Sequence, residues 1–255
     1  MVHYTPSDGC IGTAVTLTIT INDLPTITGN DTACADGTIQ LTGSGTANST
    51  NPWISSDTSV ATVSTSGLVT AVAAGTTTIT YTNSNGCSIT KTITINALPT
   101  ISGNNATCAD GTIQLTGSAT ANSTNPWTSA DTSVATVSST GLVTAVAAGT
   151  TTITYTNSNG CSITKTITIN ALPTISGNNA TCADGTIQLT GSATANSTNP
   201  WTSSDTTVAT VSSTGLVTAV AAGTTTITYT NSNGCIITKS ITINALPTTS
   251  PINFD

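Results

Sequence analysis

The stretch GTTTITYTNSNGCSITKTITIN, residues 75–96, decides the fold of this chain. Apolar and hydroxylated side chains alternate along it, so that Ile79 and Tyr81 share one face of an extended run while threonines cover the other face. The isoleucines of the second run repeat this pattern. Asn85-Gly86 lies between the two runs, which is typical of a β-hairpin turn. The stretch therefore predicts a hairpin with one apolar face and one threonine-covered face.

This hairpin belongs to a unit that recurs every 74 residues. The sequence LPTITGNDTACADGTIQLTG begins at Leu24, and close copies begin at Leu98 and Leu172. Each unit contains about seven short runs of period two and no helical spacing, which predicts one small all-β sandwich per repeat. The predicted domains are three complete repeats, a preceding partial repeat that supplies its last strands, and the start of a further repeat or a tail: 24–97, 98–171, 172–245, 1–23 and 246–255.

The composition excludes several classes of function. Ten acidic and three basic residues give a net charge of −7, and only 5% of residues are charged. A nucleic-acid partner is excluded, because the chain could not neutralise a run of phosphates. The longest apolar runs are far shorter than the ~20 residues that span a bilayer, so membrane insertion is not expected. With the single histidine, His3, no nucleophile–base–orienter set can be assembled, and we expect no enzyme.

Residues 51–82, NPWISSDTSVATVSTSGLVTAVAAGTTTITYT, resemble the bacterial immunoglobulin-like group 2 domain, and equivalent stretches occupy 125–156 and 199–230. The matching features are the Trp-x-Ser-Ser-Asp strand, Val-Ala-Thr-Val, Gly-Leu-Val and Ala-Gly-Thr. The resemblance implies tandem immunoglobulin-like β-sandwich domains in a linear array. The cysteine positions are similar to those of giant surface adhesins of Bacteroidota, which implies an extracellular location at the bacterial cell surface.

The seven cysteines allow two disulfide schemes. The intradomain scheme pairs Cys34–Cys87, Cys108–Cys161 and Cys182–Cys235. In the immunoglobulin topology that the resemblance implies, however, these partners lie at opposite ends of one domain, about 30 Å apart, whereas bridged Cα atoms lie within ~7 Å. The preferred scheme therefore joins consecutive domains through Cys34–Cys161 and Cys108–Cys235. Cys10, Cys87 and Cys182 then await partners.

Other residues carry weaker predictions. We expect Trp53, Trp127 and Trp201 to be core anchors, with carbohydrate stacking as the alternative. Thr32 and Thr206 follow aspartates in DTA and DTT, which resemble a Bacteroidota O-glycosylation acceptor. No cofactor or metal site is expected; two isolated aspartates per repeat, such as Asp36 and Asp57, are a weak signal for Ca²⁺ between domains.

The hypothesis for function is a structural stalk. Tandem sandwiches would act as a spacer in a secreted adhesin or filament, and a recognition region elsewhere would bind the unknown ligand. The expected partners are neighbouring repeats and, in a filament, like chains. The alternative is a module that binds polysaccharide or another surface through multivalent repeats.

Overall fold

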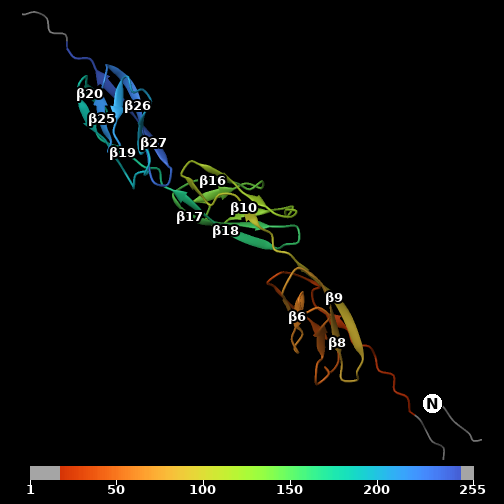
Figure 1. Cartoon of the computed structure of the whole chain (residues 1–255). Coiled ribbons are helices and arrows are strands. Elements are labelled where there is room, and N and C mark those ends of the chain that lie inside the picture. The colour runs from red at the N-terminus through yellow and green to blue at the C-terminus, as the bar shows by residue number, and fades with distance from the viewer. Residues whose placement is uncertain (1–17, 248–255) are drawn as a thin grey trace, which may run out of the picture. The chain divides into compact units, whose positions relative to one another are not determined.

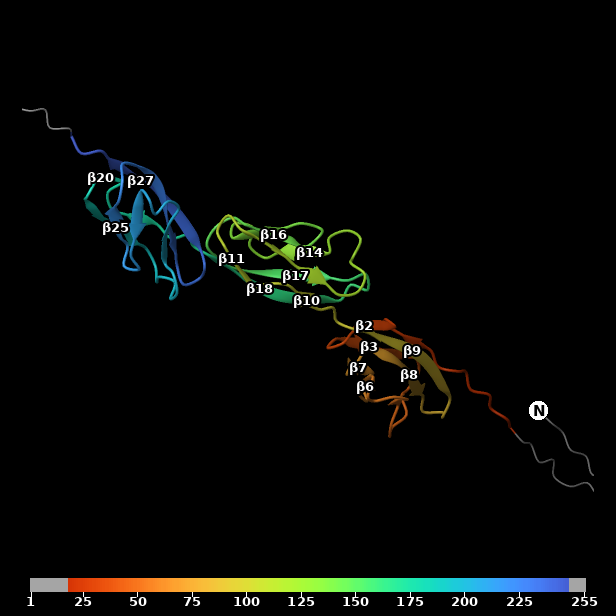
Figure 2. The same cartoon turned by 45° about the horizontal axis from the view of Figure 1, so that its top comes forward.

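A computed structural model describes residues 18–247 of the chain. The chain divides between Leu98 and Pro99 into two compact units. The first unit holds one set of strands and the second unit holds two, and the three sets repeat the same plan. The described residues contain no helix, as both views of the ribbon show (Figure 1, Figure 2). None of them therefore belongs to a helix that could cross a membrane.

Each set has nine strands. The first set comprises β1 (Ile27–Thr28), β2 (Thr32–Cys34), β3 (Thr38–Gln40), β4 (Thr42–Gly43), β5 (Trp53–Ser55), β6 (Ala61–Val63), β7 (Leu68–Ala71), β8 (Gly75–Thr82) and β9 (Ser88–Asn96). The second comprises β10 (Ile101–Ser102), β11 (Ala106–Cys108), β12 (Thr112–Gln114), β13 (Thr116–Gly117), β14 (Trp127–Ser129), β15 (Ala135–Val137), β16 (Leu142–Ala145), β17 (Gly149–Thr156) and β18 (Ser162–Asn170). The third comprises β19 (Ile175–Ser176), β20 (Ala180–Cys182), β21 (Thr186–Gln188), β22 (Thr190–Gly191), β23 (Trp201–Ser203), β24 (Ala209–Val211), β25 (Leu216–Ala219), β26 (Gly223–Thr230) and β27 (Ile236–Asn244).

Two sheets form each sandwich. In the first repeat, one sheet has the order β2-β9-β8-β5 and the other β3-β7-β6, while β1 and β4 add a two-stranded ribbon. The long pair β8 and β9 is the antiparallel hairpin predicted from residues 75–96, with Gly75 opposite Ile95 and Thr82 opposite Ser88. Strand β2 runs parallel to β9, and the other pairs are antiparallel. The predicted all-β, immunoglobulin-like fold class is confirmed.

The apolar faces of the two sheets enclose one core per repeat. In the first repeat Leu41 and Val69 come from the side of the three-stranded sheet, and Ile79 and Ile93 come from the four-stranded sheet. Each of these four side chains is at most 1% exposed. The other two repeats reproduce this cluster residue for residue, because the apolar positions recur every 74 residues. Burial of alternating aliphatic side chains thus selects the sandwich in all three copies.

The segment before the first repeat differs from its prediction where the structure describes it. Residues 18–23 form no strand, although we expected residues 1–23 to supply the last strands of a partial repeat. A strand needs a paired neighbour and a covered apolar face, and Ile19 and Ile21 are 69% and 90% exposed. The remainder of this predicted piece, with Cys10, lies outside the described residues, as do residues 248–255 of the predicted tail.

Candidate functional site

One cysteine in each repeat ends a short strand beside the end of the sandwich's last strand. Cys108 closes β11 and lies opposite Asn170, the final residue of β18. The Gly111 N–H donates to the Cys108 carbonyl over 2.9 Å, so the chain turns back immediately. Asp110 takes a left-handed φ of 71° inside this turn, a conformation that Asp tolerates better than most residues. We call Cys108 and its equivalents the strand-end cysteines: Cys34, Cys108 and Cys182.

The other cysteine of each repeat follows the turn of the long hairpin. Asn231 is 2% exposed, and its side-chain Oδ1 accepts hydrogen bonds from the N–H groups of Asn233 and Cys235, both over 3.0 Å. The Cys235 carbonyl in turn accepts from the Asn231 N–H over 3.0 Å. One buried amide therefore closes the turn and fixes the backbone of the cysteine. We call these residues the turn cysteines: Cys87, Cys161 and Cys235.

A disulfide joins these two positions from different repeats. Cys108, a strand-end cysteine, is bonded to Cys235, a turn cysteine, with their Cα atoms 5.6 Å apart and a sequence separation of 127 residues. This is a pair of the interdomain scheme. Cys34 and Cys161 are also disulfide-bonded, whereas Cys87 and Cys182 are free. Each class of position thus contains both bonded and free members.

The intradomain scheme is wrong. Cys34–Cys87 and Cys182–Cys235 do not form, because Cys87 and Cys182 are free; Cys108–Cys161 does not form, because Cys108 is bonded to Cys235. The strand register gives the physical reason. Cys108 lies beside the last residue of β18, whereas Cys161 precedes its first residue, and nine residues of strand span about 30 Å. No disulfide bridges such a distance.

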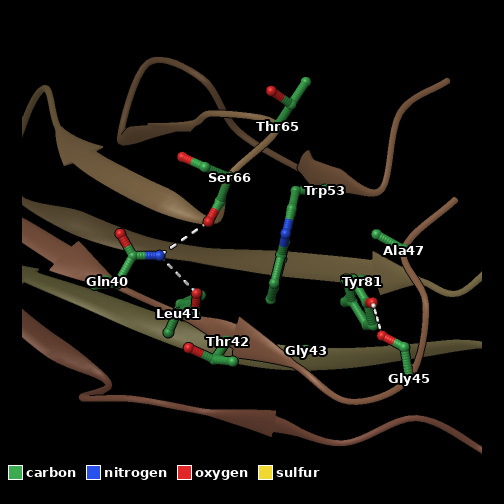
Figure 3. Close-up of a pocket in the computed structure, with 10 residues that line it drawn as sticks. All are labelled: Gln40, Leu41, Thr42, Gly43, Gly45, Ala47, Trp53, Thr65, Ser66 and Tyr81. Carbon is green, nitrogen blue, oxygen red and sulfur yellow. Dashed lines mark hydrogen bonds between the residues drawn. The ribbon is translucent and has the colours of Figure 1, made fainter. Parts of the chain in front are cut away.

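A second recurring feature is a recess beside the tryptophan of each repeat, which Figure 3 shows for the first repeat. In the first repeat its volume is about 230 Å³, and its walls include Gln40, Gly43, Trp53 and Tyr81. The equivalent recesses measure about 270 and 280 Å³. The Gln40 Nε2 amide donates to the carbonyls of Leu41 and Ser66, over 2.8 and 2.9 Å. The side-chain NH2 group of Gln40 is therefore already paired within the protein.

The three tryptophans are buried parts of the cores. Trp53, Trp127 and Trp201 are each 8% exposed and belong to the core cluster of their repeat. In Figure 3 the indole of Trp53 stands between the loop of Thr65 and Ser66 and the ring of Tyr81. A sugar that stacks on an aromatic ring needs an open ring face, which 8% exposure does not provide. This geometry favours anchoring of the core over carbohydrate stacking.

The aspartates that lie two residues after β5, β14 and β23 are parts of turns. The Asp57 carboxylate accepts from the Ser59 hydroxyl over 2.6 Å and from the Ser59 N–H over 2.9 Å, and these bonds lower the pKa of Asp57. The Asp57 N–H donates to the hydroxyl of Thr77, a buried residue of β8, over 3.0 Å. Asp131 and Asp205 repeat the arrangement, with Ser133 and Thr207 as the first cause of their lowered pKa values.

The other candidate positions lie on the surface. Thr32 begins β2 and Thr206 follows Asp205, and both are exposed, so their O-glycosylation stays a prediction. Within residues 18–247, no three side chains of His, Cys, Asp or Glu are grouped so as to hold a metal ion. The buried asparagines of the hairpin turns, Asn83, Asn157 and Asn231, were not predicted from the sequence. The available signal was the sequence Asn-Ser-Asn-Gly-Cys, which occurs unchanged in all three repeats.

Comparison with known proteins supports this description. The sequence model of the bacterial Ig-like domain (group 2) family matches three successive segments of the chain: 26–94, 100–168 and 174–236. No curated protein matches the chain.

Several solved structures are similar to the chain. An intimin mutant of EHEC O157:H7 is 27% identical over 32% of this chain and 51% of that chain, with a TM-score of 0.26. A 282-residue C-terminal fragment of intimin, solved with the intimin-binding domain of its translocated receptor, is 22% identical over 60% of this chain and 66% of that chain, with a TM-score of 0.40. Invasin, a bacterial integrin-binding protein, is 16% identical over 86% of this chain and 59% of that chain, with a TM-score of 0.39. The chain thus spans between about half and two thirds of the length of these three structures.

Proposed function

Because the chain belongs to the bacterial Ig-like domain (group 2) family, we propose that it is a spacer region of an extracellular surface protein, either an adhesin or a filament. In this role the repeats hold a distal recognition region away from the cell. The family is a non-catalytic type of domain, and we propose no enzymatic activity.

The observation that carries this proposal is the bond between Cys108 and Cys235. Disulfides persist in oxidising surroundings such as the bacterial surface and are rare in the cytosol, which supports an extracellular location. This bond joins strand β11 of one repeat to the turn before β27 of the next repeat. It therefore reinforces the succession of repeats, as a spacer under tension requires.

The bond also limits how far the chain can lengthen under tension. Residues 108–235 form a closed covalent loop, so a pull on the two ends of the chain passes through the sulfur atoms. Even if both sandwiches in that segment unfolded, the loop would add almost nothing to the end-to-end distance. A spacer with such a bond keeps the recognition region within a limited distance of the cell even when its domains unfold.

Single-molecule force spectroscopy of the whole chain, tethered at both ends, tests the proposal. Because the closed loop holds 127 positions at about 3.3 Å each, complete unfolding after reduction should give at least about 420 Å more extension than under oxidising conditions. The matched control is Cys182→Ser, which removes a free thiol and should leave both extensions unchanged. Equal extension of oxidised and reduced chains would refute the role of the bond in carrying tension.

A further inference from the structure

We propose that the two free cysteines pair with each other between two copies of this chain, so that Cys182 of one copy forms a disulfide with Cys87 of the next. The inference rests on the proposed spacer function, which it deepens by naming a partner. Each copy carries one half-site of each kind, so the contact is head-to-tail and extends into a linear series.

Cys182 occupies the same local structure as the bonded Cys108. The nine residues 178–186 are identical to residues 104–112. Cys182 lies opposite Asn244 at the end of β27, as Cys108 lies opposite Asn170 at the end of β18. The strand-end turn is also the same, because the Gly185 N–H donates to the Cys182 carbonyl over 3.0 Å. Nothing in the backbone therefore distinguishes the free strand-end cysteine from the bonded one.

Cys87 likewise has the local structure of the bonded Cys235. The buried Asn83 accepts the Cys87 N–H on its Oδ1 over 3.0 Å, as Asn231 accepts the Cys235 N–H. The Asn83 N–H donates to the Cys87 carbonyl over 3.0 Å, which again matches the bonded repeat. Cys87 is thus held in the geometry that a turn cysteine has when it is bonded to a strand-end cysteine.

Within residues 18–247, exposure also distinguishes the two free cysteines from their bonded equivalents. Within the second unit, Cys108 and Leu172 are half-buried and Pro173 is buried. Their equivalents at the end of the third repeat are all exposed: Cys182, Leu246 and Pro247. On the turn side, Cys235 is 1% exposed whereas Cys87 is only half-buried. Among the described residues, the surfaces around Cys87 and Cys182 are therefore more exposed than the equivalent surfaces at the bonded junction.

The partner that fits these surfaces is the matching end of another repeat, which a second copy supplies. The bond forms by thiol–disulfide exchange with a small oxidant such as glutathione disulfide. The two thiols, one from each chain, lose two electrons and two protons and form one S–S bond. The oxidant takes up both electrons and both protons and leaves as two molecules of reduced glutathione.

The test uses the full chain with Cys10→Ser in every sample. The chain concentration is about 1 mM, which matches the effective concentration, on the order of millimolar, of partners that are joined by a short linker. The chain is incubated with a glutathione redox buffer and examined by non-reducing electrophoresis. The parent chain should give a ladder of disulfide-linked oligomers. Cys87→Ser and Cys182→Ser should each stay monomeric alone, whereas an equimolar mixture of the two should give a dimer that grows no further. Peptide mapping of that dimer should find Cys182 joined to Cys87.

Three results would overturn the proposal: monomers in every sample, dimers of the single variants as abundant as those of the mixture, or a bond that joins Cys87 to Cys182 within one chain. Circular dichroism of both variants checks that the strands are retained, and the mapped bond of the parent ladder gives a reading that does not depend on the variants. Failure here leaves the force measurement untouched, because that experiment reports on Cys108–Cys235.

Discussion

Trp53 and Tyr81 lie opposite each other on β5 and β8, with their ring centroids 4.5 Å apart and their planes inclined by 41°. The Tyr81 hydroxyl donates to the Gly45 carbonyl over 3.4 Å, so the ring also holds the loop beyond β4. The second and third repeats contain the same aromatic pair at 4.6 and 4.5 Å. In a core made mostly of small and aliphatic side chains, this pair supplies the largest buried rings.

Replacement of Trp53 by alanine should destabilise the first repeat by about 3–5 kcal/mol, because a large aromatic side chain leaves a cavity that the sheets cannot fill. Urea denaturation followed by circular dichroism measures the free energy of unfolding. The neighbouring Ile54, which is 55% exposed, provides the control: Ile54→Ala should change this free energy by less than about 0.5 kcal/mol. Similar losses for the two variants would contradict the role of Trp53 as a core anchor.

Two glycines beside Tyr81 should respond differently to the same substitution. A Cβ atom on Gly43 would clash with the Tyr81 ring, so Gly43→Ala should cost about 1–3 kcal/mol through overpacking. Gly45 has a left-handed φ of 75° but open space around it, and the equivalent positions already hold Ala119 and Ala193, with φ of 63° and 64°.

Gly45→Ala should therefore stay within about 1 kcal/mol of the parent chain. Both free energies come from the same urea titration. If Gly45→Ala proved the more damaging change, steric contact with Tyr81 would not be the reason for glycine at position 43.

Removal of the buried amide of Asn231 should weaken the turn that carries Cys235. In Asn231→Ala the Cys235 N–H loses its acceptor in a buried position, which costs about 1–3 kcal/mol. The Cys108–Cys235 bond should also be reduced faster by dithiothreitol, since the turn then opens more often. Asn233→Ala is the control, because Asn233 is exposed and uses only its backbone N–H in this turn. Unchanged stability together with an unchanged reduction rate would show that Asn231 does not position the cysteine.

Much of this structure could be predicted from the sequence. The alternation of period two identifies the strands and their apolar faces, and the constant spacing of 74 residues shows that the same strands recur in each repeat. The alternation alone predicts that Ile79 and Ile93 lie on the apolar face, and both are fully buried. The pair Cys108–Cys235 belongs to the preferred one of two disulfide schemes, which rests on the topology that the family resemblance implies and on the length of the last strand.

Features that depend on side-chain packing in three dimensions could not be predicted in this way. The nine strands of a repeat exceed the expected number of about seven, because the two-residue strands β1 and β4 are too short to show a period. The role of Asn231 was hidden as well. The sequence does not distinguish a buried asparagine from one in a solvent-exposed turn. Only the fold shows which N–H groups the Asn231 side chain can reach.

Acid should destabilise the repeats partly through three equivalent carboxylates: Asp57, Asp131 and Asp205. The side-chain hydrogen bond from Ser59, and next the Ser59 N–H, lower the pKa of Asp57 below its ordinary value of 3.8. The folded state therefore favours the ionised carboxylate more than the unfolded chain does. This contribution to stability is complete above pH 3.8 and is lost as the pH falls through the lower pKa of the folded state.

The melting temperature should accordingly drop as the pH falls below 3.8, and the drop should be smaller when all three carboxylates are replaced through Asp57→Asn, Asp131→Asn and Asp205→Asn. Differential scanning calorimetry across this range measures it. The matched control replaces the same number of aspartates in the strand-end turns: Asp36→Asn, Asp110→Asn and Asp184→Asn. Because asparagine also tolerates the left-handed backbone of these turns, the control should fold and keep the acid sensitivity of the parent chain. If both triple variants lost the same part of the pH dependence, the hydrogen bonds from Ser59 and its equivalents would not be its source.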